Sequence, residues 1–246
     1  MPLVGLGTWQ LRRRSAYNAV SWALEAGYRH FDTATVYGNE AELGSALRDS
    51  MLPRNEVFIT TKLPPRGVGN ERRTLERSLK ALHTDHVDLW LIHWPPNGAG
   101  VAVWKAFAQA HEEGLARAIG VSNYSPRQID ELIDTTGIIP SVNQIRWSPF
   151  IFDRDRLEHC RARGVVLEGY SPFKAANLRH PLLGKLAERY GKTPVQIIVR
   201  WHVDHGVVAI PKSRRKDRIE SNIDVFDFSL RADEITELDG LAGGTQ

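Results

Sequence analysis

The sequence predicts an α/β protein, a single (β/α)8 TIM barrel over residues 1–246. Three observations support this fold class. Short apolar runs rich in β-branched residues recur along the chain without alternating apolar and polar positions, which is typical of strands buried on both faces. Helical patterns lie between these runs, and such alternation implies parallel strands with crossover helices. The chain length is also that of one such barrel.

Eight segments have the pattern of a buried strand. They are residues 3–7, which is the weakest, 29–32, 57–62, 87–93, 116–121, 141–144, 165–170 and 207–210. Eight strand–helix units without a linker favour closure into a barrel. The alternative is an open, doubly wound sheet that binds a dinucleotide at a glycine-rich loop. Gly5-Leu6-Gly7 is followed by Thr8-Trp9-Gln10, so the GxGxxG motif of that alternative is not present after the first strand.

Caps and apolar stripes define the helices. Ser15 is expected to cap a first helix that ends before Gly27. Ser125-Pro126 and Thr193-Pro194 are each an N-cap followed by proline in the first turn.

The interval between 170 and 212 holds two helical patterns, so one extra helix is expected there. A last helix is expected over 232–241, with a tail at 242–246. Side chains of the inner stripes are Leu75, Leu79, Leu82, Ile129, Leu132, Ile133, Leu182, Leu183, Leu186 and Tyr190.

Composition narrows the class of partner. The formal net charge is only +3, so we expect no nucleic-acid partner. Apolar runs fall short of the ~20 residues that span a membrane, and the first residues lack the pattern of a signal peptide. Cys160 is the single cysteine and has no disulfide partner within the chain. We therefore expect a cytoplasmic monomer without membrane contact.

Polar residues stand at the C-terminal ends of the predicted strands. In a (β/α)8 barrel these ends converge on one face, which holds the active site. The structural alternative is a set of capping residues and one buried ion pair. The strand-end residues are Asp32, Lys62, His93, Ser122, Asn123, Gln144, Tyr170 and Lys212.

Four residues from neighbouring strands could carry proton chemistry. Lys62 ends an apolar strand and must be paired or lose its charge, and Asp32 is the natural partner. Tyr37 follows Asp32 in a loop, where an adjacent ammonium would favour the phenolate and lower the pKa of the phenol. His93 could hydrogen-bond a substrate oxygen. This set predicts general acid catalysis.

Three segments of the chain resemble the signatures of the aldo-keto reductases, in the order in which that family has them. The resemblance implies reduction of small carbonyl compounds with NADPH and no metal. The matching segments are Gly27-Tyr28-Arg29-His30-Phe31-Asp32-Thr33-Ala34 with Tyr37-Gly38-Asn39-Glu40 and Leu43-Gly44, then Ile119-Gly120-Val121-Ser122-Asn123-Tyr124, then Ile210-Pro211-Lys212-Ser213 with Arg218 and Asn222.

The resemblance also implies a role for each matching residue. Tyr37 would protonate the carbonyl oxygen, Lys62 paired to Asp32 would lower the tyrosine pKa, and His93 would orient the carbonyl. The cofactor contacts implied are Ser122, Asn123 and Gln144 on the nicotinamide carboxamide, Tyr170 on its ring, Ser171, Phe173 and Lys174 along the pyrophosphate, Lys212, Ser213 and Arg218 on the 2′-phosphate, and Asn222 near the adenine.

The chain also departs from the family pattern. The N-terminal hairpin that plugs the barrel in family members is expected either to be absent or to lie outside the given sequence, and the connection 94–100 and the tail 242–246 are short. These two segments normally wall the substrate pocket, so the substrate stays open. Trp9 and Trp94, and with them Trp147, are expected to form an aromatic wall.

Other functions remain as alternatives. Lys62 could be the nucleophile of a Schiff-base aldolase, although pairing with Asp32 would keep it protonated. A metal hydrolase would need more ligands than one Asp and one His. A non-catalytic NADP-binding regulatory subunit would keep the cofactor contacts without turnover.

Overall fold

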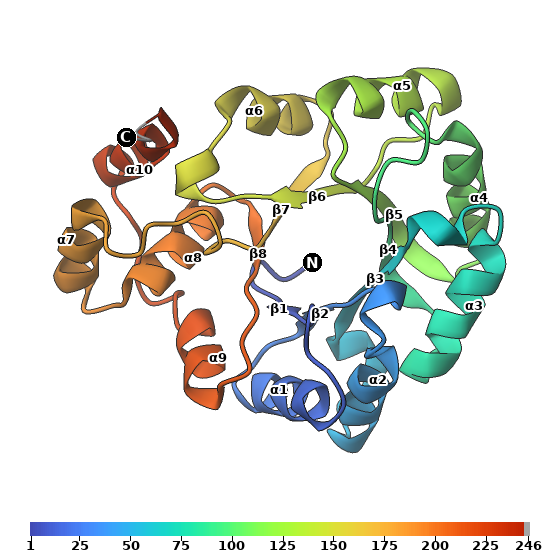
Figure 1. The fold of residues 1–246 in the computed structure, drawn as a ribbon, viewed down its shortest axis with the longest axis horizontal. Helices are drawn as coiled ribbons and strands as arrows, with labels where there is room; N and C mark the ends of the chain where they lie inside the picture. The colour runs from blue at the N-terminus through green and yellow to red at the C-terminus, as the bar shows by residue number, and fades with distance from the viewer. Residues whose placement is uncertain (244–246) are drawn as a thin grey trace.

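A ring of eight parallel strands forms the centre of the computed structural model, which describes residues 1–243 (Figure 1). Each strand pairs with the next along the chain. The ends of the sheet also meet, because Gly5 N donates to Ala209 O at 2.8 Å and Val4 forms a bridge with Ala209. The predicted barrel is confirmed and the open sheet is wrong. The strands are β1 (Leu6–Gly7), β2 (His30–Asp32), β3 (Phe58–Leu63), β4 (Val87–Ile92), β5 (Ala116–Ser122), β6 (Val142–Arg146), β7 (Val166–Tyr170) and β8 (Val208–Ile210).

The helices surround this ring on its outside (Figure 1). Two of them, α7 and α8, lie between β7 and β8, where one extra helix was expected. The helices within residues 1–243 are α1 (Arg14–Glu25), α2 (Glu40–Asp49), α3 (Glu71–Leu82), α4 (Val101–Glu112), α5 (Pro126–Thr136), α6 (Arg154–Ala162), α7 (Pro181–Tyr190), α8 (Pro194–Asp204), α9 (Lys216–Ile223) and α10 (Ala232–Asp239). None of these described helices is long and apolar enough to cross a membrane.

The caps expected for α5 and α8 are present as complete capping boxes at Ser125 and Thr193. The cap expected at Ser15 is wrong. Helix α1 begins at Arg14, and the Ser15 hydroxyl donates to the Arg12 carbonyl at 2.7 Å. The last helix ends at Asp239 and continues as a 3-10 turn, Gly240–Gly243; residues 244–246 of the expected tail lie outside the described residues.

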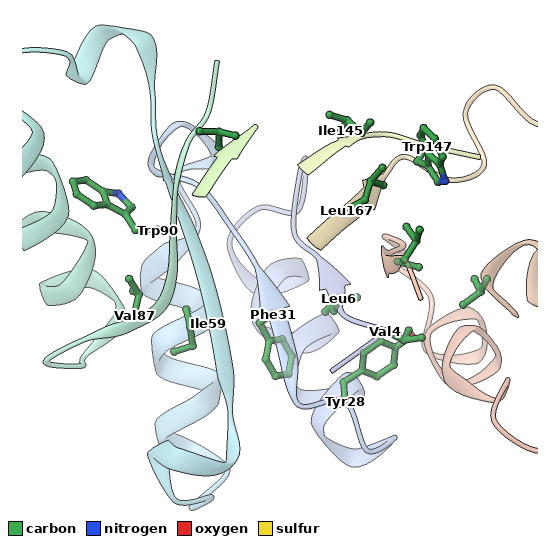
Figure 2. Close-up of a cluster of buried hydrophobic side chains, with 14 of the residues drawn as sticks. Val4, Leu6, Tyr28, Phe31, Ile59, Val87, Trp90, Ile145, Trp147 and Leu167 are labelled. Atoms are coloured by element: carbon green, nitrogen blue, oxygen red, sulfur yellow. The ribbon is translucent and has the colours of Figure 1, made fainter. Parts of the chain in front are cut away.

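Side chains alternate between the barrel interior and the layer of helices, as the period of a strand requires. Outward residues such as Phe31, Ile59 and Trp90 join the large apolar core (Figure 2). Trp90 stacks on Phe107 of α4 with ring centroids 3.6 Å apart. The interior is only partly apolar: Leu89, Leu91 and Val142 form a small separate cluster. Phe58 and Ala118 pack against this cluster. Other interior positions are polar, among them His30, Lys62 and Gln144, and such buried polar groups need partners inside the barrel.

Candidate active site

A cavity of about 660 Å³ opens where the strands end, which is a typical size for a small-molecule site. Most of the site residues expected from the sequence line it. They are Trp9, Asp32, Tyr37, His93, Trp94, Ser122, Asn123, Gln144, Tyr170, Ser171, Phe173, Lys174 and Lys212. Lys62, Ser213, Arg218 and Asn222 are outside this lining.

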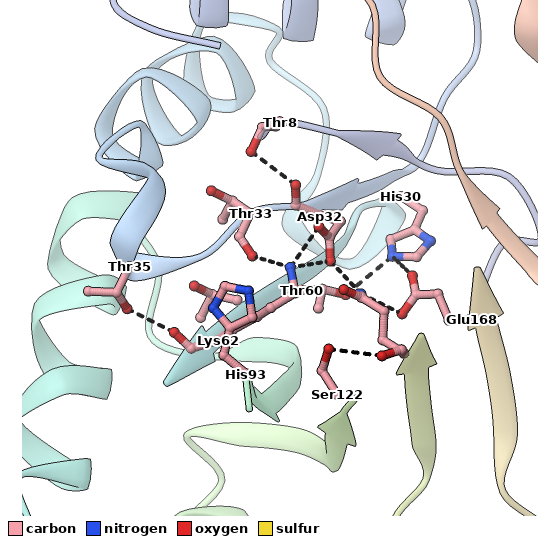
Figure 3. A network of polar contacts seen from close by, with 12 residues as sticks. Thr8, His30, Asp32, Thr33, Thr35, Thr60, Lys62, His93, Ser122 and Glu168 are labelled. Carbon is pink, nitrogen blue, oxygen red and sulfur yellow. Dashed lines mark hydrogen bonds and ion pairs between the residues drawn. The ribbon is translucent and has the colours of Figure 1, made fainter. Parts of the chain in front are cut away.

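Lys62 and Asp32 form a buried ion pair beneath the cavity (Figure 3). Lys62 Nζ donates to both carboxylate oxygens at 2.7 Å and to the Thr33 carbonyl at 2.8 Å. Burial by itself lowers the pKa of Lys62, but the charge and hydrogen bonds of Asp32, together with Tyr37, outweigh it, and the pKa lies above its ordinary value. A lysine held as a cation is a poor amine nucleophile, which argues against the Schiff-base aldolase.

Tyr37 is held at the cavity by a short 3-10 turn, Thr35–Tyr37, that follows β2. The turn is tied down on one side by Thr35 Oγ1, which donates to the Lys62 carbonyl at 3.0 Å. On the other side Asn39 Nδ2 donates to the Thr8 carbonyl at 2.8 Å. These bonds set the tyrosine ring 5.2 Å from Lys62 Nζ.

The acidity of Tyr37 differs from the expectation. Burial raises the pKa of the Tyr37 phenol above its ordinary value, and the positive charge of Lys62 lowers it by less. The predicted influence of Lys62 is present, but the predicted net lowering is wrong because desolvation of the phenolate is the larger effect. At neutral pH Tyr37 therefore carries its proton.

His93 follows β4 and lies beside Tyr37, with the two ring centroids 5.8 Å apart. Burial, helped by the charge of Lys62, lowers the pKa of His93 to about 3. The imidazole is therefore neutral. It can orient an oxygen through a hydrogen bond but does not supply an acidic proton.

The polar residues after β5, β6 and β7 are joined by hydrogen bonds. Tyr170 Oη donates to Asn123 Oδ1 at 2.8 Å, and Asn123 Nδ2 donates to the His93 carbonyl at 3.1 Å. Ser122 Oγ donates to the Gln144 carbonyl at 2.9 Å. Asn123 (φ 65°) and Ser171 (φ 52°) have left-handed backbone conformations. Such strain in residues other than glycine is concentrated at functional sites.

In the basic turn after β8 and the first turn of α9, two cations make neither an ion pair nor a side-chain hydrogen bond within residues 1–243. Arg215 is paired with Asp217, Lys216 is paired with Glu25, and Arg214 donates to the Gln10 carbonyl. Lys212 and Arg218 have no carboxylate partner within residues 1–243. Burial, followed by the charge of Arg214, lowers the pKa of half-buried Lys212. Two unpaired cations at the start of a helix fit an anionic group such as a phosphate.

Sequence reasoning missed Arg12, which lines the cavity, and two further charged residues that lie on strands. Arg146 lines the cavity, and Glu168 is fully buried below it. Each is two positions from a predicted residue on the same strand, Gln144 on β6 and Tyr170 on β7, and so faces the same side. The period of two along these strands could have found both.

The aromatic wall is smaller than expected. Trp9 and Trp94 line the cavity and are 45% and 49% exposed. Trp147 is buried away from it and packs against Phe152 and Trp201. Its position one residue after Arg146 directs it to the outer side of β6, so its expected place in the wall is wrong.

Comparisons with known proteins agree over nearly the whole chain. The profile of the Aldo/keto reductase family matches residues 3–242. The chain is 42% identical over 247 residues to a methylglyoxal reductase of Yersinia pestis, covering 97% of this chain and 89% of that protein. It is 41% identical over 248 residues to the 9,11-endoperoxide prostaglandin H2 reductase of Trypanosoma cruzi, covering 98% of this chain and 88% of that protein.

Solved structures give the same result. A crystal structure of an aldo-keto reductase from a Medee basin deep-sea metagenome library has a TM-score of 0.95 and 38% identity, covering 100% of this chain and 93% of that one. An aldo-keto reductase of Bombyx mori, in complex with NADP, has a TM-score of 0.92 and 35% identity, covering 98% of this chain and 89% of that one.

Proposed function

The chain belongs to the Aldo/keto reductase family, and from this premise we propose that it reduces aldehydes and ketones to alcohols with NADPH, using Tyr37 as the general acid. One observation carries the proposal. A protonated phenol lies at the cavity directly beside a buried lysine–aspartate pair, with a neutral histidine next to it. A binding subunit without turnover would not need this arrangement.

The residues of the site divide the proton chemistry among them. NADPH, when bound, would supply the hydride that the carbonyl carbon accepts. Tyr37 donates its proton to the carbonyl oxygen as negative charge develops there, which completes the alcohol. The ammonium of Lys62 stabilises the phenolate that remains, until the phenolate takes a proton from water. The neutral His93 donates a hydrogen bond that orients the carbonyl.

The polar residues around the cavity fit this cofactor. Ser122, Asn123 and Gln144 line the cavity where the nicotinamide carboxamide would bind, and Tyr170 would stack on its ring. The amide nitrogen of Gln144 is bonded to Asp32 and Glu168, so Gln144 would offer the carboxamide its amide oxygen. The pyrophosphate would follow Ser171, Phe173 and Lys174. Lys212, Ser213 and Arg218 would hold the 2′-phosphate, and Asn222 would lie near the adenine.

The substrate is proposed as a class, because the two named relatives act on dissimilar compounds at nearly equal identity to this chain. Trp9 and Trp94 give the outer cavity an apolar, aromatic surface. We therefore propose small aliphatic or aromatic carbonyl compounds.

Tyr37→Phe tests the proposed acid. We expect kcat for a reactive aldehyde to fall by about 10²–10⁴-fold, the usual contribution of a general acid, because the variant lacks the phenolic proton. The dissociation constant for NADPH should stay within about twofold, since the hydroxyl is assigned to the carbonyl. Consumption of NADPH and quenching of protein fluorescence measure the two quantities. A variant with the wild-type kcat would reject Tyr37 as the acid.

A further inference from the structure

A second buried carboxyl group is connected to the catalytic ion pair by one amide. Gln144 Nε2 donates to Asp32 Oδ2 at 2.7 Å and to Glu168 Oε2 at 3.0 Å. Both neighbours are carboxyl oxygens, so the nitrogen end of the amide must face them. Gln144 therefore spans the barrel interior between β2 and β7.

This buried cluster contains more acid than base. Asp32 and Glu168 are two carboxyl groups, and Lys62 is the ammonium beside them; all three are buried. His30 Nε2 lies 3.5 Å from Glu168 Oε1, but burial lowers the pKa of His30 to about 3, so it brings no positive charge at neutral pH. An excess negative charge without a partner is costly in such a place.

The strands beside Glu168 offer no other compensation. In register with Glu168 are Gln144 on β6 and the apolar Val208 on β8. The histidine of the adjacent helix, His202, contacts the neighbouring Gly169 instead, and burial lowers the pKa of His202 to about 4. The cluster is electrically balanced when Glu168 keeps a proton. That proton belongs on Oε1, since Oε2 accepts from Gln144.

We propose that Glu168 is a positioning residue for the carbonyl chemistry: as a neutral acid it holds the Gln144 amide against Asp32 and leaves the charge of Lys62 free to act on Tyr37. This inference rests on the proposed function for its catalytic consequence. The contacts of Glu168 are with Gln144 and His30, so it acts through other residues and not on the substrate.

Ionisation of Glu168 should change the site at alkaline pH. Burial, and after it the charge of Asp32, raises the pKa of Glu168 to about 8. Above that pH the new carboxylate opposes the charge of Lys62 and so raises the pKa of Tyr37. A charge roughly 10 Å away shifts a pKa by on the order of one unit at an effective dielectric constant of about 20.

The pH profile of Glu168→Gln tests the proposal. Glutamine keeps the hydrogen bond to Gln144 but cannot ionise. In kcat/KM for carbonyl reduction, we expect the alkaline decline, which reports loss of the Tyr37 proton, to move down by about one pH unit. Glu234→Gln is the matched control, because it neutralises another buried carboxyl group, on α10, and should leave the decline in place. A change in plateau activity without a shift of the decline would assign Glu168 a structural role and overturn the proposal.

Two spectroscopic measurements do not depend on turnover. Infrared spectra should show a protonated carboxyl band at pH 7 that disappears by about pH 9.5 in the wild type and is absent from Glu168→Gln. Phenolate absorption of Tyr37, isolated by subtracting the Tyr37→Phe protein, should titrate at lower pH in the Glu168→Gln background. Absence of the carboxyl band, or equal phenolate titrations, would overturn the inference even if the enzyme reduced no carbonyl tested.

Discussion

The charge of Lys62 is tolerated in the barrel only because Asp32 accompanies it. Removing one partner of a buried ion pair costs about 3–5 kcal/mol, whereas removing both charges together can be nearly neutral. The catalytic need for Lys62 can therefore be separated from its part in stability by comparing one variant that breaks the pair with one that deletes it.

Lys62→Met should lose at least about 10²-fold in kcat and also unfold more easily, because Asp32 is left unpaired. The double variant Asp32→Asn with Lys62→Met should recover most of the free energy of unfolding but none of the activity. Urea unfolding and NADPH consumption measure the two effects. Activity that returned together with stability would show that Lys62 has no electrostatic role in turnover.

For these individual residues, the sequence predicted the pairing of Lys62 with Asp32 and the position of Tyr37 beside Lys62. It did not predict the net pKa of Tyr37. Proximity can be read from neighbouring strand ends, but the cost of burying a phenolate depends on how completely the surrounding elements exclude water. Burial of Tyr37 follows from packing that no short segment determines.

Among the elements, the turn between β8 and α9 should decide the coenzyme. Lys212 and Arg218 are without carboxylate partners among the described residues, so their charges remain available for a 2′-phosphate. Two charge-assisted contacts could favour NADPH over NADH by roughly 2–4 kcal/mol, or about 30- to 1000-fold.

Arg218→Ala should remove at least about tenfold of that preference, because one charge-assisted bond is lost. Arg215→Ala is the control, since Arg215 is already paired with Asp217 and should leave the preference intact. Dissociation constants for NADPH and NADH, measured by fluorescence quenching in the wild type and in both variants, test this assignment. If the wild type binds NADH as tightly as NADPH, the phosphate assignment is wrong; a preference that Arg215→Ala alone abolished would move it to Arg215.

Element boundaries were predictable where a local hydrogen bond sets them. The Ser-Pro and Thr-Pro starts of α5 and α8 carry their own capping partners three residues later. Ser15 has the right residue type, but its hydroxyl bonds backwards to Arg12, and the helix begins before it. Residue type predicts a cap only when the partner is also within the same turn.

For the whole molecule, buried neutral histidines make the fold sensitive to acid. Burial lowers the pKa of His202 to about 4, while the unfolded chain titrates near 6.5. Below pH 6.5 the unfolded state binds a proton that the folded state does not, so the free energy of unfolding decreases as pH falls towards 4. His30 and His93, whose pKa values are lowered to about 3, act in the same direction.

His202→Gln should therefore flatten this dependence. Between pH 7 and pH 5 the wild type should lose up to about 2 kcal/mol of stability through His202 alone, and the variant should not. Tm measured at the two pH values gives the comparison, with the exposed His83→Asn as control. An equal decline in the wild type and His202→Gln would mean that His202 does not contribute.

The closed barrel was predictable from the alternation of elements, but the contacts across it were not. Asp32 of β2 and Glu168 of β7 come together through Gln144 of β6, far apart in the chain. Spacing along the sequence shows which side of a strand a residue faces. It does not show which distant strand supplies its partner.

The left-handed conformation of Ser171 means that the surrounding structure holds this residue in a backbone conformation that serine disfavours. A side chain in that region costs roughly 1–2 kcal/mol, which glycine avoids. Ser171→Gly should therefore match or exceed the wild type in Tm, and Ser171→Val should fall well below it. Both variants should bind NADPH more weakly, because the hydroxyl is gone. If glycine lowered Tm as much as valine, the backbone at this position would not be under strain. Substitutions of Ser171 should therefore rank in one order by Tm and in another order by affinity for NADPH.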